Sequence, residues 1–155
     1  MFYIKRLTIV TGNGVLSNLD FDAGLNIIHG ESNTGKSLIV DCIDYMFGAN
    51  EHRFDQKLGI KEIRLVVNVD GNTVSMARKI DSTEFEVSSS VPDIESDTYK
   101  TGKAKKSIGA VWLQMMGIED EVKIIQTLVG KPQKLTLRTF HHLFLIDEQR
   151  VQGVS

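Results

Sequence analysis

The stretch GLNIIHGESNTGKSLIVDCIDYMFG, residues 24–48, decides what kind of fold this chain adopts. Residues 25–29 form a short apolar run, which is typical of a buried strand. A glycine-containing segment follows. Apolar residues then recur at helical spacing over residues 37–47, and Gly48 is a plausible helix stop. We therefore predict a strand, a tight loop and an amphipathic helix in immediate succession.

The tight loop, residues 30–37, matches the pattern Gly-x-x-x-x-Gly-Lys-Ser, which is the Walker A phosphate-binding loop. Its glycines allow backbone amides to turn inward around a phosphate, and the helix that follows adds partial positive charge. Lys36 is expected to bind the β- and γ-phosphates, and the Ser37 hydroxyl is expected to bind magnesium. We predict that ATP and Mg2+ are bound by Gly30, Glu31, Ser32, Asn33, Thr34, Gly35, Lys36, Ser37 and Leu38.

The segments around the loop indicate its setting. Residues 2–10 and 15–21 are strand-like and flank a turn cluster, so the chain opens with a β-hairpin. After the loop and its helix, clean alternation predicts an antiparallel meander of three strands. We predict one α/β P-loop NTPase lobe over residues 1–155. Its parts are the β-hairpin, Walker A strand-loop-helix over 1–48, the antiparallel β meander over 58–88, a loop over 89–102, and C-terminal helices over 103–155.

Composition excludes several classes of protein. The chain is 41% hydrophobic and 25% charged, as in folded domains that bury a core, and its net charge is -2. This charge argues against a compact, strongly basic DNA-binding module. Cys42 is the one cysteine, so no internal disulfide forms, and it is expected to be a small core residue. The start of the chain shows no secretory n-region or h-region, so we expect a cytoplasmic protein. No apolar run reaches the ~18 residues that a membrane span needs, so we expect no membrane partner.

The order of these elements resembles the N-terminal part of an ABC-type ATPase head of the SMC, RecN and RecF kind. The approach GLNIIHG, residues 24–30, and the Phe47-Gly48 step occupy the same places as in that family. The hairpin VNVDGNTVSMARKI, residues 67–80, is similar to the family's strand pair that ends in a basic residue, here Arg78. Kinases and GTPases with the same loop instead continue with parallel strands and crossover helices.

The resemblance implies an ATPase that couples ATP binding and hydrolysis to DNA maintenance, repair or defence. It also implies a second ATPase head as a partner, in a homodimer, and DNA as a further partner. Basic residues near the meander or the run over 103–106 would contact that DNA. The family's Q-loop glutamine touches magnesium and the attacking water. Gln149 stands at that place, and Gln152 is the alternative.

The segment LFLIDE, residues 143–148, leaves a second interpretation open. It reads as a Walker B strand in which Asp147 holds the magnesium shell and Glu148 is the general base. The chain would then be a self-contained P-loop phosphotransferase or small NTPase. A further interpretation of the segment is a plain helix end, and a further interpretation of the chain is a sensor that binds nucleotide without turnover.

The ABC-type interpretation carries its own expectation about activity. A signature motif near Leu-Ser-Gly-Gly and a switch histidine do not occur in the sequence. On this interpretation the second half of the head follows Ser155, and residues 1–155 alone bind ATP but barely hydrolyse it.

Overall fold

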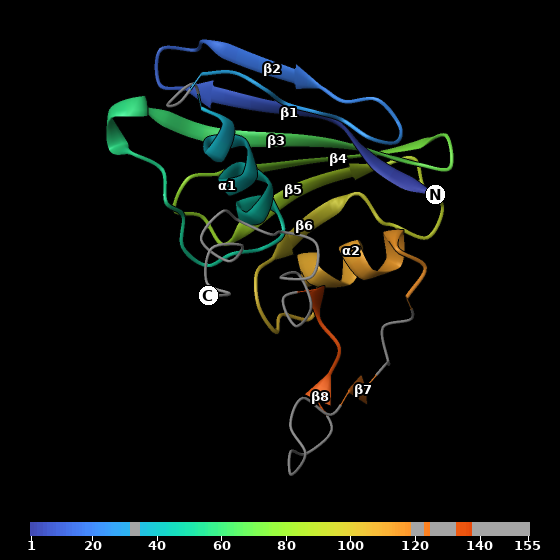
Figure 1. The fold of residues 1–155 in the computed structure, drawn as a ribbon. Coiled ribbons are helices and arrows are strands. Elements are labelled where there is room, and N and C mark those ends of the chain that lie inside the picture. The colour runs from blue at the N-terminus through green and yellow to red at the C-terminus, as the bar shows by residue number, and fades with distance from the viewer. Residues whose placement is uncertain (32–34, 119–122, 125–132, 138–155) are drawn as a thin grey trace, which may run out of the picture.

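The computed structural model describes residues 1–31, 35–118, 123–124 and 133–137. Six of the described strands form one antiparallel sheet in the order β2-β1-β3-β4-β5-β6 (Figure 1). These strands are β1 Phe2–Thr11, β2 Leu16–Asp20, β3 Ile60–Val69, β4 Asn72–Lys79, β5 Glu84–Ser89 and β6 Asp97–Lys100. The remaining described elements are α1 Lys36–Met46, the 3-10 turn η1 Gln56–Leu58, α2 Ile108–Met115, and a separate pair of short strands, β7 Lys123–Ile124 and β8 Gln133–Lys134.

Alternation of side chains gives the sheet one apolar face. On β3, Ile63, Leu65 and Val67 are fully buried, while Arg64 between them is exposed. The neighbouring strands continue this layer, because Leu65 lies opposite Met76 on β4. Helices α1 and α2 both lie on this side of the sheet (Figure 1).

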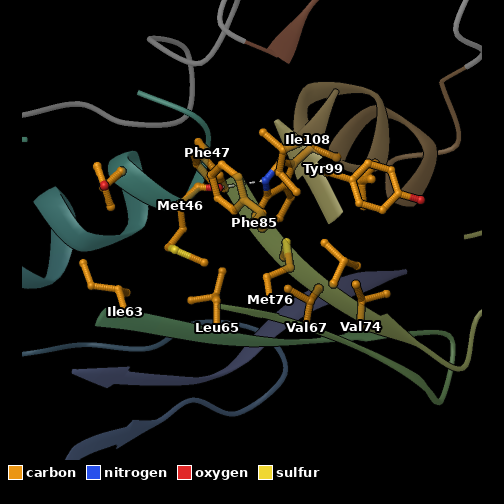
Figure 2. Close-up of a cluster of buried hydrophobic side chains, with 14 of the residues drawn as sticks. Met46, Phe47, Ile63, Leu65, Val67, Val74, Met76, Phe85, Tyr99 and Ile108 are labelled. Atoms are coloured by element: carbon orange, nitrogen blue, oxygen red, sulfur yellow. Dashed lines mark hydrogen bonds between the residues drawn. The ribbon is translucent and has the colours of Figure 1, made fainter. Parts of the chain in front are cut away.

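The core forms where the ends of the two helices meet the middle strands. Figure 2 shows Met46 and Phe47, from the end of α1, above the β3 and β4 side chains. Trp112 on α2 packs edge-on against Phe47 with 4.6 Å between ring centroids, and its indole Nε1 donates to the Met46 carbonyl over 3.1 Å. The Met46 carbonyl at the end of α1 is therefore hydrogen-bonded to α2, which also packs against this end of the helix.

Three predicted elements are confirmed. The opening hairpin is the antiparallel pair β1 and β2, and the helix after the phosphate loop is α1. The meander is β3, β4 and β5, joined by tight turns as the alternating pattern indicated. Gly48 directly follows the last turn of α1 with a φ of 95°, a backbone conformation that glycine adopts readily.

Two predicted boundaries are wrong. The loop over 89–102 contains β6, whose pairing with β5 places Tyr99 opposite the core residue Phe85. β6 is an edge strand with three exposed residues in four, so its composition reads as loop. The next helix begins at Ile108 and not at Lys103, because Ser107 caps its first turn.

The buried strand predicted over residues 25–29 is also absent. This segment adopts no regular secondary structure, and its Leu25 and Ile27 side chains are 88% and 76% exposed. Asn26 folds back on the turn before it: its side-chain amide donates to the Asp22 and Gly24 carbonyls, and its oxygen accepts from the Asp22 amide. Such local bonds compete with strand pairing when no neighbouring strand offers partners.

α1 and α2 have eleven and eight residues, and no helix in the described part of the chain is long and apolar enough to cross a membrane.

Candidate phosphate-binding site

The N-terminus of α1 directly follows the predicted phosphate loop. Gly35 precedes the helix in a left-handed conformation, with φ 89° and ψ 10°, which a residue with a Cβ adopts at a cost. Its carbonyl accepts the Ile39 amide over 3.3 Å, so the helix winds from this residue onward. No acidic residue occupies the first turn, so no carboxylate competes there with an anion for the helix amides.

The Lys36 side chain reaches back across the loop to its beginning. Its Nζ donates to the Gly30 carbonyl over 2.7 Å and also to the Glu31 carbonyl. These carbonyl oxygens are weak, neutral acceptors for a full positive charge. Phosphate oxygens would be stronger acceptors in the same place, since charge-assisted hydrogen bonds are about twice as strong as neutral ones.

Two further described residues of the predicted site, Ser37 and Leu38, lie in the first turn of α1. Ser37 is exposed at the start of α1 beside Lys36, where its hydroxyl is accessible to a ligand. Leu38, also predicted to contact the nucleotide, is partly buried and packs against the core. Magnesium prefers oxygen ligands and takes most of them from phosphates and water, so one exposed hydroxyl is a fitting contribution from this loop.

Several predicted site residues lie outside the described part of the chain. These are Ser32, Asn33 and Thr34 of the loop, and Asp147, Glu148, Gln149 and Gln152 of the C-terminal segment. The structure therefore brings together the two ends of the phosphate loop, Gly30 with Glu31 and Gly35 with Lys36. The Q-loop, Walker B and helix-end interpretations of residues 143–149 all stay predictions.

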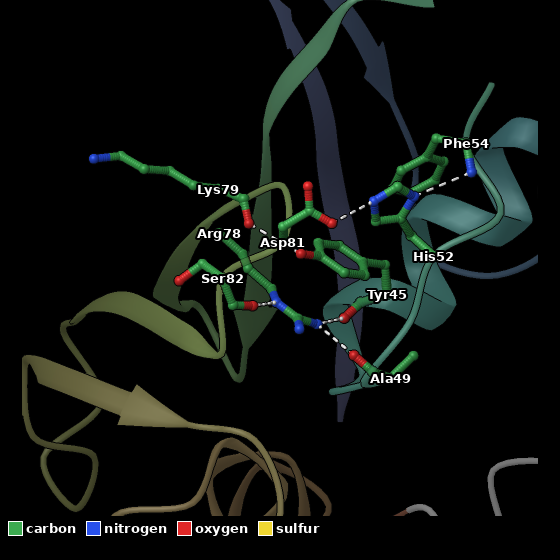
Figure 3. Close-up of polar contacts among 8 residues, drawn as sticks. All are labelled: Tyr45, Ala49, His52, Phe54, Arg78, Lys79, Asp81 and Ser82. Carbon is green, nitrogen blue, oxygen red and sulfur yellow. Dashed lines mark hydrogen bonds and ion pairs between the residues drawn. The ribbon is translucent and has the colours of Figure 1, made fainter. Parts of the chain in front are cut away.

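The C-terminal end of α1 carries a second polar centre, around Arg78 of β4 (Figure 3). The Arg78 side chain is 1% exposed, and its guanidinium carbon lies 3.6 Å from the centre of the Tyr45 ring. Burial lowers the pKa of Arg78 from its usual value, and the facing Tyr45 partly opposes this shift. The sequence signal was the inward register of β4, in which Arg78 follows Val74 and Met76 on the apolar face.

Another buried group on α1 is the Cys42 thiol. Its side chain is fully buried between the helix and the sheet, as predicted for a core residue. Burial, and to a smaller extent the charge of Asp41, raises the pKa of Cys42 to about 12. A neutral thiol in this place is a packing group and not a nucleophile.

Within the described residues, no cluster of three or more histidine, cysteine or acidic side chains is placed to hold a metal ion.

A left-handed glycine, a helix N-terminus and a lysine directed back to the start of the loop are features that P-loop nucleotide-binding proteins share. Comparison with protein families agrees: the chain belongs to the AAA domain family, whose model matches residues 14–153. The matched region contains the whole phosphate loop and the segment with Asp147 and Gln149. AAA domains belong to the P-loop ATPase superfamily, so the family supports nucleotide binding and ATPase function. No curated protein matches the chain.

Proposed function

We propose that this chain is the ATP-binding N-terminal part of an ATPase head of the SMC, RecN and RecF kind. In this proposal the head couples ATP binding and hydrolysis to DNA maintenance, repair or defence. Residues 30–38 bind the nucleotide with Mg2+, and Gln149 of the Q-loop contacts the metal and the attacking water. A second head of the same protein completes the site, and DNA is a further partner.

The exposed apolar approach to the phosphate loop is the observation that carries this proposal. A self-contained P-loop enzyme buries the strand before the loop in a parallel sheet, where both faces are covered. Here Leu25, Ile27 and Ile28 are exposed, as is Val40 on α1. All neighbouring strands of the described six-stranded sheet are antiparallel, and none of them leads into the loop. These features favour half of a site that further protein covers.

The described residues would each act on the nucleotide in a definite way. Lys36 would exchange the Gly30 and Glu31 carbonyls for phosphate oxygens, and the first amides of α1 would add their partial charge to the same anion. The Ser37 hydroxyl would be the loop's ligand for Mg2+, which neutralises phosphate charge when bound. None of these groups abstracts a proton, so turnover needs groups from elsewhere, such as Gln149 and the second head.

Replacement of Lys36 by alanine tests nucleotide binding. We expect Lys36→Ala to abolish measurable ATP binding by titration calorimetry in the presence of Mg2+, because the side chain supplies the one full positive charge among the described residues of the phosphate loop. Lys5→Ala is the matched control: it removes the same charge from an exposed lysine of β1. It should leave the ATP dissociation constant unchanged.

The same titration separates the proposal from its competitors. Equal binding by Lys36→Ala and the wild type would refute the phosphate loop as the nucleotide site. Binding that depends on Lys36, with fast turnover by residues 1–155 alone, would instead favour the self-contained enzyme that uses Asp147 and Glu148. Lys36-dependent binding with negligible turnover by these residues is the expected result for half of an active site.

A further inference from the structure

The guanidinium of Arg78, on β4, caps the C-terminal end of α1, the helix that follows the phosphate loop. Its Nη1 donates to the carbonyls of Tyr45 and Ala49 over 2.7 Å and 2.8 Å, and its Nε donates to the Ser82 carbonyl over 2.8 Å. Tyr45 lies in the last turn of α1, whose own last turn contains no basic residue. The Tyr45 carbonyl also accepts the Gly48 amide over 3.1 Å, so Arg78 adds a charged donor to the backbone cap at this helix end.

The charge of Arg78 is balanced by dipoles and aromatic rings. None of the ion pairs among the described residues includes Arg78. Its neighbours are three carbonyls and the faces of Tyr45 and Phe85, at 3.6 Å and 4.8 Å from the guanidinium carbon. The negative end of the α1 dipole and the ring faces both favour a cation. A buried charge with this partner set has only one position that satisfies it, which fixes α1 relative to β4.

Contacts from the turn between β4 and β5 also hold α1 in this position relative to β4. Asp81 has a φ of 60°, and the chain reverses there so that the Ser82 carbonyl points back at Arg78. The Asp81 carboxylate accepts a hydrogen bond from His52 at 3.0 Å, and the Tyr45 hydroxyl donates to the Lys79 carbonyl over 2.9 Å. Figure 3 shows these contacts converging on one end of α1 from the hairpin and from the segment after the helix.

We propose that Arg78 is a positioning residue for nucleotide binding: by fixing the C-terminal turn of α1 against the β4–β5 hairpin, it sets where the phosphate loop lies at the other end of the helix. This inference rests on the proposed nucleotide-binding function. It assigns to Arg78 an action on a site that its side chain does not touch.

The length of α1 explains why a contact at one end matters at the other. An eleven-residue helix is about 16 Å long, so a tilt of about 4° about its C-terminal turn moves its N-terminus by about 1 Å. Misplacement of a positioned group by about 1 Å costs up to about a hundred-fold in function. In the first turn of α1, Leu38 and Ile39 are only partly buried against the core, and Ser37 and the preceding Gly35 are exposed.

The test compares three variants of the whole protein: Arg78→Met, Arg78→Lys and Val74→Ala. Val74 is a buried residue of the same strand without a polar contact to α1, so its truncation controls for loss of stability alone. We expect Arg78→Met to weaken ATP binding by about ten-fold. Lysine keeps the charge but lacks the planar fork that reaches several acceptors, so Arg78→Lys should weaken binding by about three-fold. Val74→Ala should lower the melting temperature and leave ATP affinity unchanged.

Amide hydrogen exchange provides a readout that needs no nucleotide. The Ile39 amide, which donates a hydrogen bond to the Gly35 carbonyl, should exchange faster in both Arg78 variants than in Val74→Ala. If Arg78→Met does not fold, Arg78→Lys decides alone. Wild-type affinity together with wild-type exchange at Ile39 in a folded Arg78 variant would overturn the inference. A wild-type protein that binds no ATP would refute the proposed function, and the exchange result would then decide whether Arg78 positions α1.

Discussion

The Cys42 thiol on α1 illustrates how burial determines the chemistry of a single residue. Its pKa is raised to about 12, first because the thiolate would be buried in the core and second because Asp41 is negative. Only the thiolate reacts with disulfide reagents. We therefore predict that Cys42 in the folded protein resists such a reagent at about pH 8, whereas an exposed thiol, with a pKa of about 8.5, reacts readily. The measurement is the rate of labelling in native buffer.

Unfolding in concentrated guanidinium chloride is the control, because it should restore rapid labelling. Since the folded-state pKa is raised, the contribution of Cys42 to stability is fully present below about pH 8.5 and declines as pH rises toward the folded-state value. Rapid labelling of the native protein would show that α1 opens away from the sheet.

At the scale of the element, α2 depends on its capping residue. The Ser107 hydroxyl oxygen accepts from the Gly109 amide over 3.2 Å, and the hydroxyl donates to the Gly102 carbonyl over 2.9 Å. We predict that Ser107→Ala lowers the free energy of unfolding by about 1 kcal/mol, the typical cost of a lost N-cap. Urea denaturation measures it, and the slope of the transition should not change.

Ser88→Ala is the matched control for Ser107→Ala. Ser88 is exposed on β5 and takes no part in a helix cap, so its replacement should change stability by no more than about 0.5 kcal/mol. An equally small effect of Ser107→Ala would mean that packing of Trp112 and Val111, and not the cap, holds the start of α2.

At the scale of the whole molecule, the half-site proposal predicts which residues turnover requires. If Gln149 belongs to a Q-loop, Gln149→Ala in the complete protein should slow ATP hydrolysis by about a hundred-fold, the effect of losing a group that orients the attacking water. The specific rate should also rise with protein concentration, because two heads enclose the nucleotide. Steady-state phosphate release measures both.

The Glu148→Gln variant distinguishes the Walker B interpretation of residues 143–148 from the Q-loop interpretation. Hydrolysis that vanishes in Glu148→Gln, survives Gln149→Ala and does not depend on protein concentration would identify residues 143–148 as a Walker B strand. The chain would then be a self-contained P-loop enzyme, and the exposure of Leu25 and Ile27 would need another explanation.

Local patterns in the sequence determined much of this protein. The glycines and Lys36 of the phosphate loop, the alternation of β3 and the helical spacing of α1 each depend on neighbours a few residues away, so they could be predicted before any contact was known. The family match over residues 14–153 supports the same part of the interpretation.

Contacts between distant segments were decided only by the tertiary structure. Tyr99 joins the core because β6 pairs with β5, although its segment has the composition of a loop. Arg78 caps α1 because the register of β4 turns its side chain toward a helix end 33 residues earlier in the chain. Residues 25–29 have the pattern of a buried strand, yet burial needs a partner surface, and pattern alone supplies none. A sequence states what each segment favours, whereas burial and pairing depend on what the rest of the fold brings beside it.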